Sequence, residues 1–202
     1  MKDLILDHRD DYRMYGLVPY NISPIQQGIQ FGHALQEYNN YFIDNQESKN
    51  KHTLNIDSEY KKAFDSWRLF GKTFIVLNGG TTNNRIIEGE YFGSLNKYKE
   101  ELDKAGILNA TFKEPDLGEQ LTAIVFLAPK QVYNKKEYPD FLDYIKLNTQ
   151  FNYELFEDIK EEYDSGFSTN SEYKKIYDEW INFIGGNRNL FLREFLKHLK
   201  FA

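Results

Sequence analysis

One histidine of this chain stands among side chains that could do chemistry together. Gln26, Gln30, His33 and Glu37 are spaced so that, on a helix, they would line one face. Amide groups can position a substrate, and a histidine that titrates near neutral pH can transfer a proton or contact an anion. The spacing predicts a polar site along this helix. The alternative is a solvent-exposed helix face that carries one histidine.

A second polar group follows in the segment Glu114-Pro-Asp-Leu-Gly. Glu114 and Asp116 come at the end of an expected strand, and Thr122 lies at the start of the next one. Because α/β folds place their chemistry at strand ends, we expect these residues to meet His33. A histidine oriented by Asp116 could activate water for attack on an ester. In the alternative interpretation, the two carboxylates accept hydrogen bonds from backbone N–H groups of their own turn.

Other kinds of site have little support in the sequence. The chain has no cysteine, and its histidines show no paired spacing; they are His8, His33, His52 and His198. No glycine-rich phosphate-binding motif is present. Residues 79–82 (Gly-Gly-Thr-Thr) could present backbone N–H groups to an anion, although an ordinary turn is favoured. The sequence therefore predicts no metal site and no cofactor.

The helix that carries His33 has a clear start. Ser23 is suited to the N-cap position and Pro24 to the first helical turn. The apolar and small residues at helical spacing predict its packed face; they are Ile25, Gly28, Ile29, Gly32 and Leu35. The two glycines, four residues apart, would let a neighbouring element approach closely.

The elements around this helix predict an α/β fold. Residues 43–57 are polar and turn-rich, which indicates a loop. Strands are expected at 12–19, 72–77, 108–113 and 121–127, and helices at 24–41, 58–71 and 94–106. The last strand is apolar almost throughout, so it should be central. We expect a four-stranded mixed sheet with helices on both faces, in a domain of residues 1–130.

A helical, aromatic-rich extension is expected over residues 131–202. Its helices are predicted at 139–148, 152–164, 171–183 and 188–199. The aromatic side chains would pack on one another and on the α/β core, or form an interface with a protein partner or a second copy through residues 139–202. Within it, residues 171–180 nearly repeat residues 58–67, which predicts two similar helix faces or a chance match between two amphipathic helix starts.

Composition limits the functional classes. Of the 202 residues, 41% are hydrophobic, enough for a core, and the net charge is −6. An acidic chain does not indicate broad affinity for nucleic acid, although Arg68, Lys72, Arg85 and Lys113 could form a local basic rim. No apolar run is long enough to span a membrane or to act as a signal peptide. The composition predicts a cytoplasmic protein without membrane contact.

Several of these segments together resemble a known family. The residues are Gln30-Phe-Gly-His-Ala34 after the strand Met14-Tyr-Gly-Leu-Val-Pro19, then Ala105-Gly-Ile107, Glu114-Pro-Asp-Leu117 and Leu121-Thr-Ala-Ile124. In this order they resemble the type II peptidyl-tRNA hydrolases, and most closely an uncharacterised bacterial and phage branch of that superfamily. The resemblance covers residues 12–128 and implies the fold of that family. It also implies His33, Gln30, Asp116 and Thr122 as site residues.

Two departures bear on the activity. The hydrolases carry a lysine just before their QxxHA segment, where this chain has Gln26 and Gln27, and a Thr-Gln loop that the segment 114–120 lacks. Glutamine cannot supply the fixed positive charge of lysine. The first hypothesis is therefore a non-catalytic module that binds a small nucleotide-like ligand or a protein partner. The alternative is an esterase acting on peptidyl-tRNA or a related aminoacyl ester, with tRNA itself disfavoured.

In the esterase alternative, each candidate residue has a role. His33 would be the base and Asp116 would orient it. Substrate would contact Gln26, Gln30, Glu114 and Thr122.

Overall fold

A computed structural model describes residues 11–42, 58–83, 85–148, 153–165 and 171–202. The predicted loop 43–57, His8 and His52 lie outside these residues. The chain divides into two compact units. Unit 1 comprises Met1–Pro129 and Phe195–Ala202, and unit 2 comprises Lys130–Glu194. One division thus falls beside the expected boundary at residue 130, whereas the last residues of the expected extension belong with the α/β unit.

Unit 1 is built on a four-stranded mixed sheet, as the sequence predicts. Its strands are β1 (Tyr12–Val18), β2 (Phe74–Asn78), β5 (Asn109–Glu114) and β6 (Gln120–Pro129), in the order β2-β1-β6-β5. β1 is parallel to β2 and antiparallel to β6, and β6 is antiparallel to β5. β6 is central and is buried at every residue up to Ala128, which confirms the inference from its apolar sequence.

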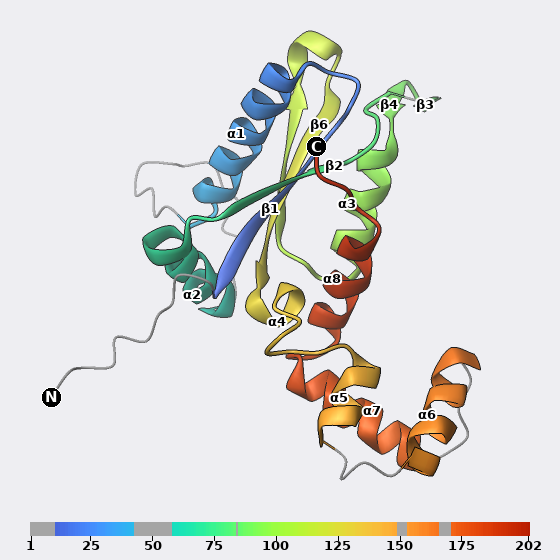
Figure 1. Cartoon of the computed structure of the whole chain (residues 1–202). Helices are drawn as coiled ribbons and strands as arrows, with labels where there is room; N and C mark the ends of the chain where they lie inside the picture. Colours follow the sequence, from blue (N-terminus) through green and yellow to red (C-terminus); the bar gives the residue numbers. More distant parts are fainter. Residues whose placement is uncertain (1–10, 43–57, 84, 149–152, 166–170) are drawn as a thin grey trace, which may run out of the picture. The chain divides into compact units, whose positions relative to one another are not determined.

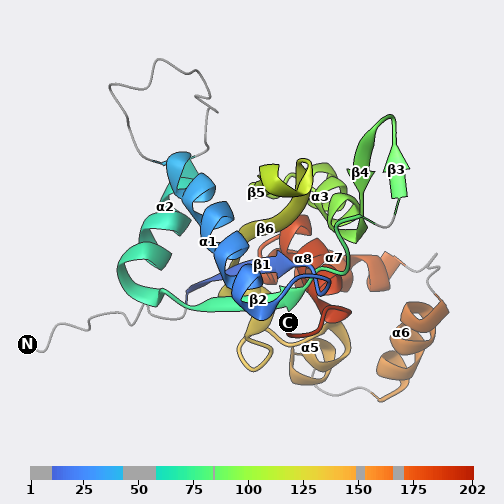
Figure 2. The ribbon, with the colours of Figure 1, turned by 90° about the horizontal axis from the view of Figure 1, so that it is seen from above.

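Helices cover both faces of this sheet (Figures 1 and 2). α1 (Pro24–Asn40) and α2 (Ser58–Ser66) share a core with one face, in which Ala34, Tyr38 and Phe64 pack with Met14 and Val125. On the other face, Tyr15 and Phe126 stack on each other. Phe126 also contacts Phe195 of α8 (Asn187–Lys197), and Phe195 in turn contacts Tyr98 of α3 (Ser94–Lys104).

The predicted packed face of α1 is confirmed at Leu35, which packs against the core, but is wrong at its other residues. Ile25 and Ile29 are 78% and 51% exposed, and a Cβ added at Gly28 or Gly32 would meet no atom within 4 Å. The buried residues of α1 are Gln30, Ala34 and Tyr38. The helix is thus rotated about its axis relative to the expected orientation. It buries Gln30 against the sheet, whereas the sequence pattern predicted that Ile29 would be buried.

The glycine that allows close approach to α1 lies in the sheet. A Cβ at Gly16 of β1 would come within 2.2 Å of the Phe31 ring. Any side chain at this position would therefore displace Phe31 from the sheet. Close packing of helix on strand depends on Gly16, not on the two glycines of the helix.

Two local features differ from expectation. α2 does not continue as an α-helix to Gly71 but widens into a π-helical turn, η1 (Trp67–Gly71), closed by Lys72 with a φ of 55°. A two-stranded hairpin, β3 (Arg85–Ile87) and β4 (Glu90–Phe92), was not predicted. Its turn residues Glu88 and Gly89 have φ values of 51° and 87°, as tight hairpin turns require.

The remaining elements are short or lie at the edge of the sheet. A 3₁₀ turn, η2 (Pro115–Leu117), joins β5 to β6. Beyond β2, Phe201 forms an antiparallel bridge with Leu77, the Asn78 N–H donates to Lys200 O, and the Ala202 N–H donates to Val76 O.

Unit 2 is helical, as predicted. It contains α4 (Lys130–Tyr133), α5 (Phe141–Asn148), α6 (Tyr153–Ser165), α7 (Ser171–Phe183) and the first part of α8. Aromatic and aliphatic side chains form its core, namely Phe141, Ile145, Phe156, Ile159, Trp180 and Ile184. The aromatic residues of the described helices thus supply a core of their own.

Candidate functional site

Three of the predicted site residues meet between α1 and the β5–β6 turn. Gln30 Nε2 donates to Glu114 Oε2 at 2.5 Å, and Thr122 Oγ1 donates to Gln30 Oε1 at 2.8 Å. Gln30 is 6% exposed and Thr122 is fully buried. The helix stripe and the later acidic turn therefore converge, which was the basis of the site hypothesis.

The polar atoms of this group are occupied by one another. Glu114 Oε1 accepts from the Asp116 N–H at 3.4 Å, so both of its carboxylate oxygens have partners. Thr122 Oγ1 also lies 3.2 Å from Phe112 O, and its one proton can serve only one acceptor at a time. A buried glutamine with both ends of its amide bonded is a stable internal crosslink. The arrangement ties α1 to the sheet.

A register shift in the sheet explains how Thr122 reaches α1. Phe112 pairs with Ala123, but the next residue, Lys113, pairs with Leu121. Thr122 is thereby left without a partner on β5, as in a β-bulge, and such irregularities redirect a side chain. Its hydroxyl turns toward Gln30 as a result.

The other predicted residues lie apart from this group. His33 is exposed and its ring stacks on Phe112 with centroids 4.4 Å apart. Asp116 is also exposed, and within the described chain no hydrogen bond joins it to His33. Gln26 forms a capping box with Ser23: the Gln26 N–H donates to Ser23 Oγ, and the Ser23 N–H donates to Gln26 Oε1. These contacts define local structural roles, and the catalytic roles stay predictions.

Two N–H groups of the glycine-rich loop after β2 form hydrogen bonds within the protein. The Gly79 N–H donates to Val18 O at 2.7 Å and the Gly80 N–H to Asn78 Oδ1 at 2.8 Å. These two groups are not presented to an anion. The geometry agrees with an ordinary turn.

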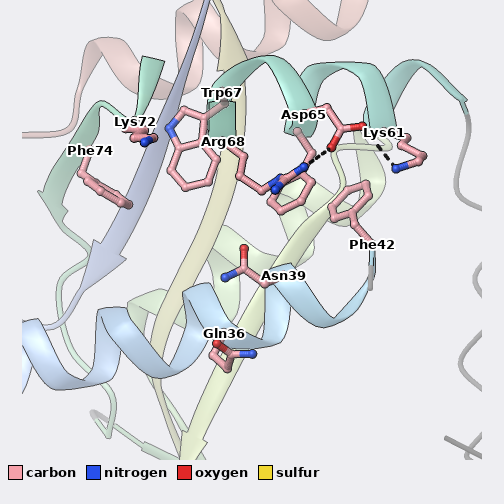
Figure 3. A pocket seen from close by; sticks show the side chains of 10 residues that line it. Gln36, Asn39, Phe42, Lys61, Asp65, Trp67, Arg68, Lys72 and Phe74 are labelled. Carbon is pink, nitrogen blue, oxygen red and sulfur yellow. Dashed lines mark hydrogen bonds and ion pairs between the residues drawn. The ribbon is translucent and has the colours of Figure 1, made fainter. Parts of the chain in front are cut away.

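A pocket of about 560 Å³ lies elsewhere on unit 1, between α1, α2, η1 and β2 (Figure 3). Its lining combines aromatic, basic and amide side chains with one carboxylate; the residues are Gln36, Asn39, Phe42, Lys61, Phe64, Asp65, Trp67, Arg68, Lys72 and Phe74. The sequence analysis did not identify it, although Arg68 and Lys72 were named as part of a possible basic rim.

One end of the pocket is aromatic. The Trp67 and Phe74 rings meet edge to face, with centroids 5.4 Å apart. Trp67 is 5% exposed, and its indole N–H donates to Thr73 O at 3.1 Å, which fixes the ring. Phe31 also contacts the Phe74 ring edge to face, with centroids 5.5 Å apart, but Phe74 is still 45% exposed. This end therefore offers a partly open aromatic surface.

The other end is charged. Asp65 accepts hydrogen bonds from Lys61 Nζ and Arg68 Nη2, each at 3.2 Å. Desolvation disfavours the ionised carboxylate, but the hydrogen bonds and charges of Lys61 and Arg68 outweigh it and lower the pKa of Asp65 below its usual value. A third cation, Lys72, lies at the aromatic end beside Phe74 (Figure 3), and the described residues give it no ion pair.

The residues that line the pocket therefore carry a net positive charge, although the net charge of the whole chain is negative. Three basic side chains line it against one carboxylate, whereas the whole chain has a net charge of −6. A concave site with aromatic surface and a few polar groups is the usual form of a small-molecule site. An excess of cations makes the electrostatic potential in such a cavity more favourable for anions than for cations.

Other kinds of site can be assessed for the described residues. Among them, no group of three or more His, Asp or Glu side chains is placed to hold a metal ion. In the same part of the chain, no helix combines the length and apolar character needed to cross a membrane.

No protein-family model matches this chain, and no curated protein sequence matches it.

Proposed function

We propose that this protein is a non-catalytic binding module that takes a small nucleotide-like ligand in the pocket between α1, α2, η1 and β2. The observation that carries the proposal is the combination of an open aromatic surface at Phe74 with the cations Arg68, Lys61 and Lys72 in one cavity.

The chemistry of a nucleotide matches this combination. A base has a flat π-face that stacks on aromatic rings with little dependence on sequence. A phosphate group is bound by lysine as a point charge and by arginine through two parallel N–H donors. The amides of Asn39 and Gln36 on the α1 side offer both donors and acceptors to the edges of a base or to a ribose hydroxyl (Figure 3).

The esterase alternative has less support from the geometry. It needs His33 as a base oriented by Asp116, and in the described residues His33 instead stacks on Phe112. The residues that do converge, Gln30, Glu114 and Thr122, bond one another. A protein partner on the aromatic helices also has less support, because many of those side chains form the core of unit 2.

Titration with nucleoside 5′-monophosphates, followed by calorimetry and by ¹H–¹⁵N NMR, tests the proposal. We expect binding that shifts the Trp67 indole N–H resonance and leaves that of Trp180, in unit 2, unchanged. The variant Lys61→Ala should weaken binding, because it removes one of the cations at the charged end.

A matched control exists in the repeated segment. Lys174 of α7 is the counterpart of Lys61, and Lys174→Ala should leave the affinity at the wild-type value. No binding of any nucleoside monophosphate to the wild-type protein, or equal loss in both lysine variants, would refute the proposed function. Release of product from peptidyl-tRNA or an aminoacyl ester that stops in His33→Ala would favour the esterase instead.

A further inference from the structure

The two ends of the pocket differ: Phe74 offers an exposed ring beside Lys72 at one end, and Lys61 and Arg68 share a carboxylate toward the other. In Figure 3, Phe74, Lys72 and Trp67 lie at one end, and Asp65 and Lys61 at the other, with Arg68 between them. A nucleotide also has an apolar end and an anionic end. The matching orientation places the base beside Phe74 and the phosphate beside Arg68 and Lys61.

The aromatic rings near the charged end are less available for stacking. Phe42 and Phe64 already stack on each other, with centroids 4.2 Å apart and an interplanar angle of 8°. Phe64 is also 4% exposed, whereas Phe74 is 45% exposed. A planar base therefore finds its open ring surface at the Phe74 end.

Asp65 occupies the place of an anion beside Lys61 and Arg68. It is the carboxylate that Lys61 and Arg68 share, and each reaches it through one contact of 3.2 Å. The side chains are partly exposed, at 61% for Lys61, 53% for Arg68 and 36% for Asp65. Ion pairs of this exposure contribute little to stability, so they can be exchanged for a better partner.

We infer that the phosphate of the ligand displaces the Asp65 carboxylate from Arg68 and Lys61, so that Asp65 competes with the ligand and lowers the affinity of the pocket for anions. This inference rests on the proposed function. A terminal phosphate carries close to two negative charges at neutral pH and three acceptor oxygens, against one charge for a carboxylate. A phosphodiester carries only one charge, so both its attraction to the two cations and its repulsion by the nearby Asp65 are smaller.

The variant Asp65→Asn tests this directly. Three probes are titrated into the wild-type and variant proteins: adenosine, adenosine 5′-monophosphate and adenosine 3′,5′-cyclic monophosphate. Removing the competing charge should tighten both phosphate-bearing probes by about fivefold or more, with the larger gain for the doubly charged 5′-monophosphate, because repulsion by Asp65 grows with the charge of the probe. Adenosine should bind both proteins equally, because it brings no charge to Arg68.

The control is Asp178→Asn in α7, at the position equivalent to Asp65, which should change none of the affinities. If wild-type protein binds the monophosphate and Asp65→Asn binds it equally or more weakly, the inference fails and the proposed function stands. If neither protein binds any probe, both fail. If only Asp65→Asn binds, the wild-type protein does not bind such a ligand, and both the proposed function and the inference fail. Circular dichroism of the variant confirms that the fold is retained.

Discussion

α2 and α7 begin with the same residues, Ser-Glu-Tyr-Lys-Lys, and each matched segment ends in a tryptophan, yet their surroundings differ. Trp67 and Trp180 are 5% and 4% exposed, and each indole N–H donates to a backbone carbonyl at 3.1 Å, Thr73 O and Pro139 O. The repeat is therefore used twice to anchor a helix by its tryptophan. The two segments differ in the residue that follows the tryptophan and in whether that residue borders a cavity or a packed core.

After Trp67 the chain has Arg68, which is exposed and lines the pocket; after Trp180 it has Ile181, which packs on the core of unit 2. The cation near Trp180 comes from α8. Arg193 lies with its guanidinium 5.8 Å from the Trp180 ring and is 2% exposed at its side chain. One amphipathic segment thus borders an open, charged cavity in unit 1 and a closed, aromatic core in unit 2. The residues that surround each helix therefore determine whether its surface borders a cavity or packs into a core.

The largest expected effect comes from removing an anchor. Trp180→Ala should lower the free energy of unfolding of unit 2 by about 3–5 kcal/mol, because a large buried ring and its contacts with Phe141 and Tyr177 are lost. Denaturant unfolding followed by the fluorescence of Trp67 should show the unit 1 transition in place. Trp67→Ala, followed through Trp180, is the reciprocal control. Equal shifts of both transitions would contradict a separate anchor in each unit.

The two arginines should separate stability from binding. Arg193 donates to Gln131 O, Tyr138 O and Asp140 Oδ1 at 2.6, 2.8 and 2.6 Å. Arg193→Ala leaves two carbonyls without their donor and should cost about 2–4 kcal/mol of unfolding free energy. Arg68→Ala, at an exposed ion pair, should cost less than about 1 kcal/mol. Urea denaturation of both variants measures this, and a larger loss for Arg68→Ala would reverse the comparison.

Acid should weaken unit 2 through Asp140. Desolvation acts against its charged form, but hydrogen bonds and charges from Lys135 and Arg193 prevail and lower the pKa of Asp140 below its usual value. The folded pKa is thus below the unfolded one, so the stabilisation is complete above about pH 4 and is lost as the pH falls through the folded pKa. Asp140→Asn should destabilise unit 2 at pH 7, and the difference should vanish in strong acid. A difference that persists unchanged at low pH would exclude this cause.

The smallest expected effect on stability concerns the two equivalent tyrosines of the repeated segment, Tyr60 and Tyr173. Tyr60 Oη donates to Gly106 O at 2.7 Å and accepts from the Leu108 N–H at 3.3 Å. Tyr173, its counterpart, contributes ring contacts with Phe141 and Tyr177. Tyr60→Phe should therefore cost about 1 kcal/mol, and Tyr173→Phe should be close to neutral. Matched thermal unfolding curves measure both, and equal losses would show that the hydroxyls have equivalent roles.

The sequence predicted the elements that depend on local signals. Ser23 and Pro24 marked the start of α1, and the apolar run of β6 indicated a central strand. The β3–β4 hairpin also has a local signal, because Glu88-Gly89 between short apolar strands is typical of a tight turn. The hairpin could therefore have been predicted from the sequence.

Features that depend on distant partners could not be predicted in the same way. Ile25 and Ile29 were the apolar choice for the packed face of α1, but Gln30 is buried there because Thr122 and Glu114 satisfy its amide. Gly28 and Gly32 matched the pattern for close approach, while the contact is made over Gly16. The pocket joins residues from α1, α2, η1 and β2, and no spacing in the chain indicates that they share a cavity.

The short bridge at Phe201 has a consequence for handling this protein. Residues 200–202 take up backbone hydrogen bonds along the outer side of β2, where strand order leaves no other neighbour in the sheet. An uncovered outer strand is a template for pairing with another molecule. Shortening the chain before Lys200 would expose this template beside Phe74, and self-association would then compete with any occupant of the pocket.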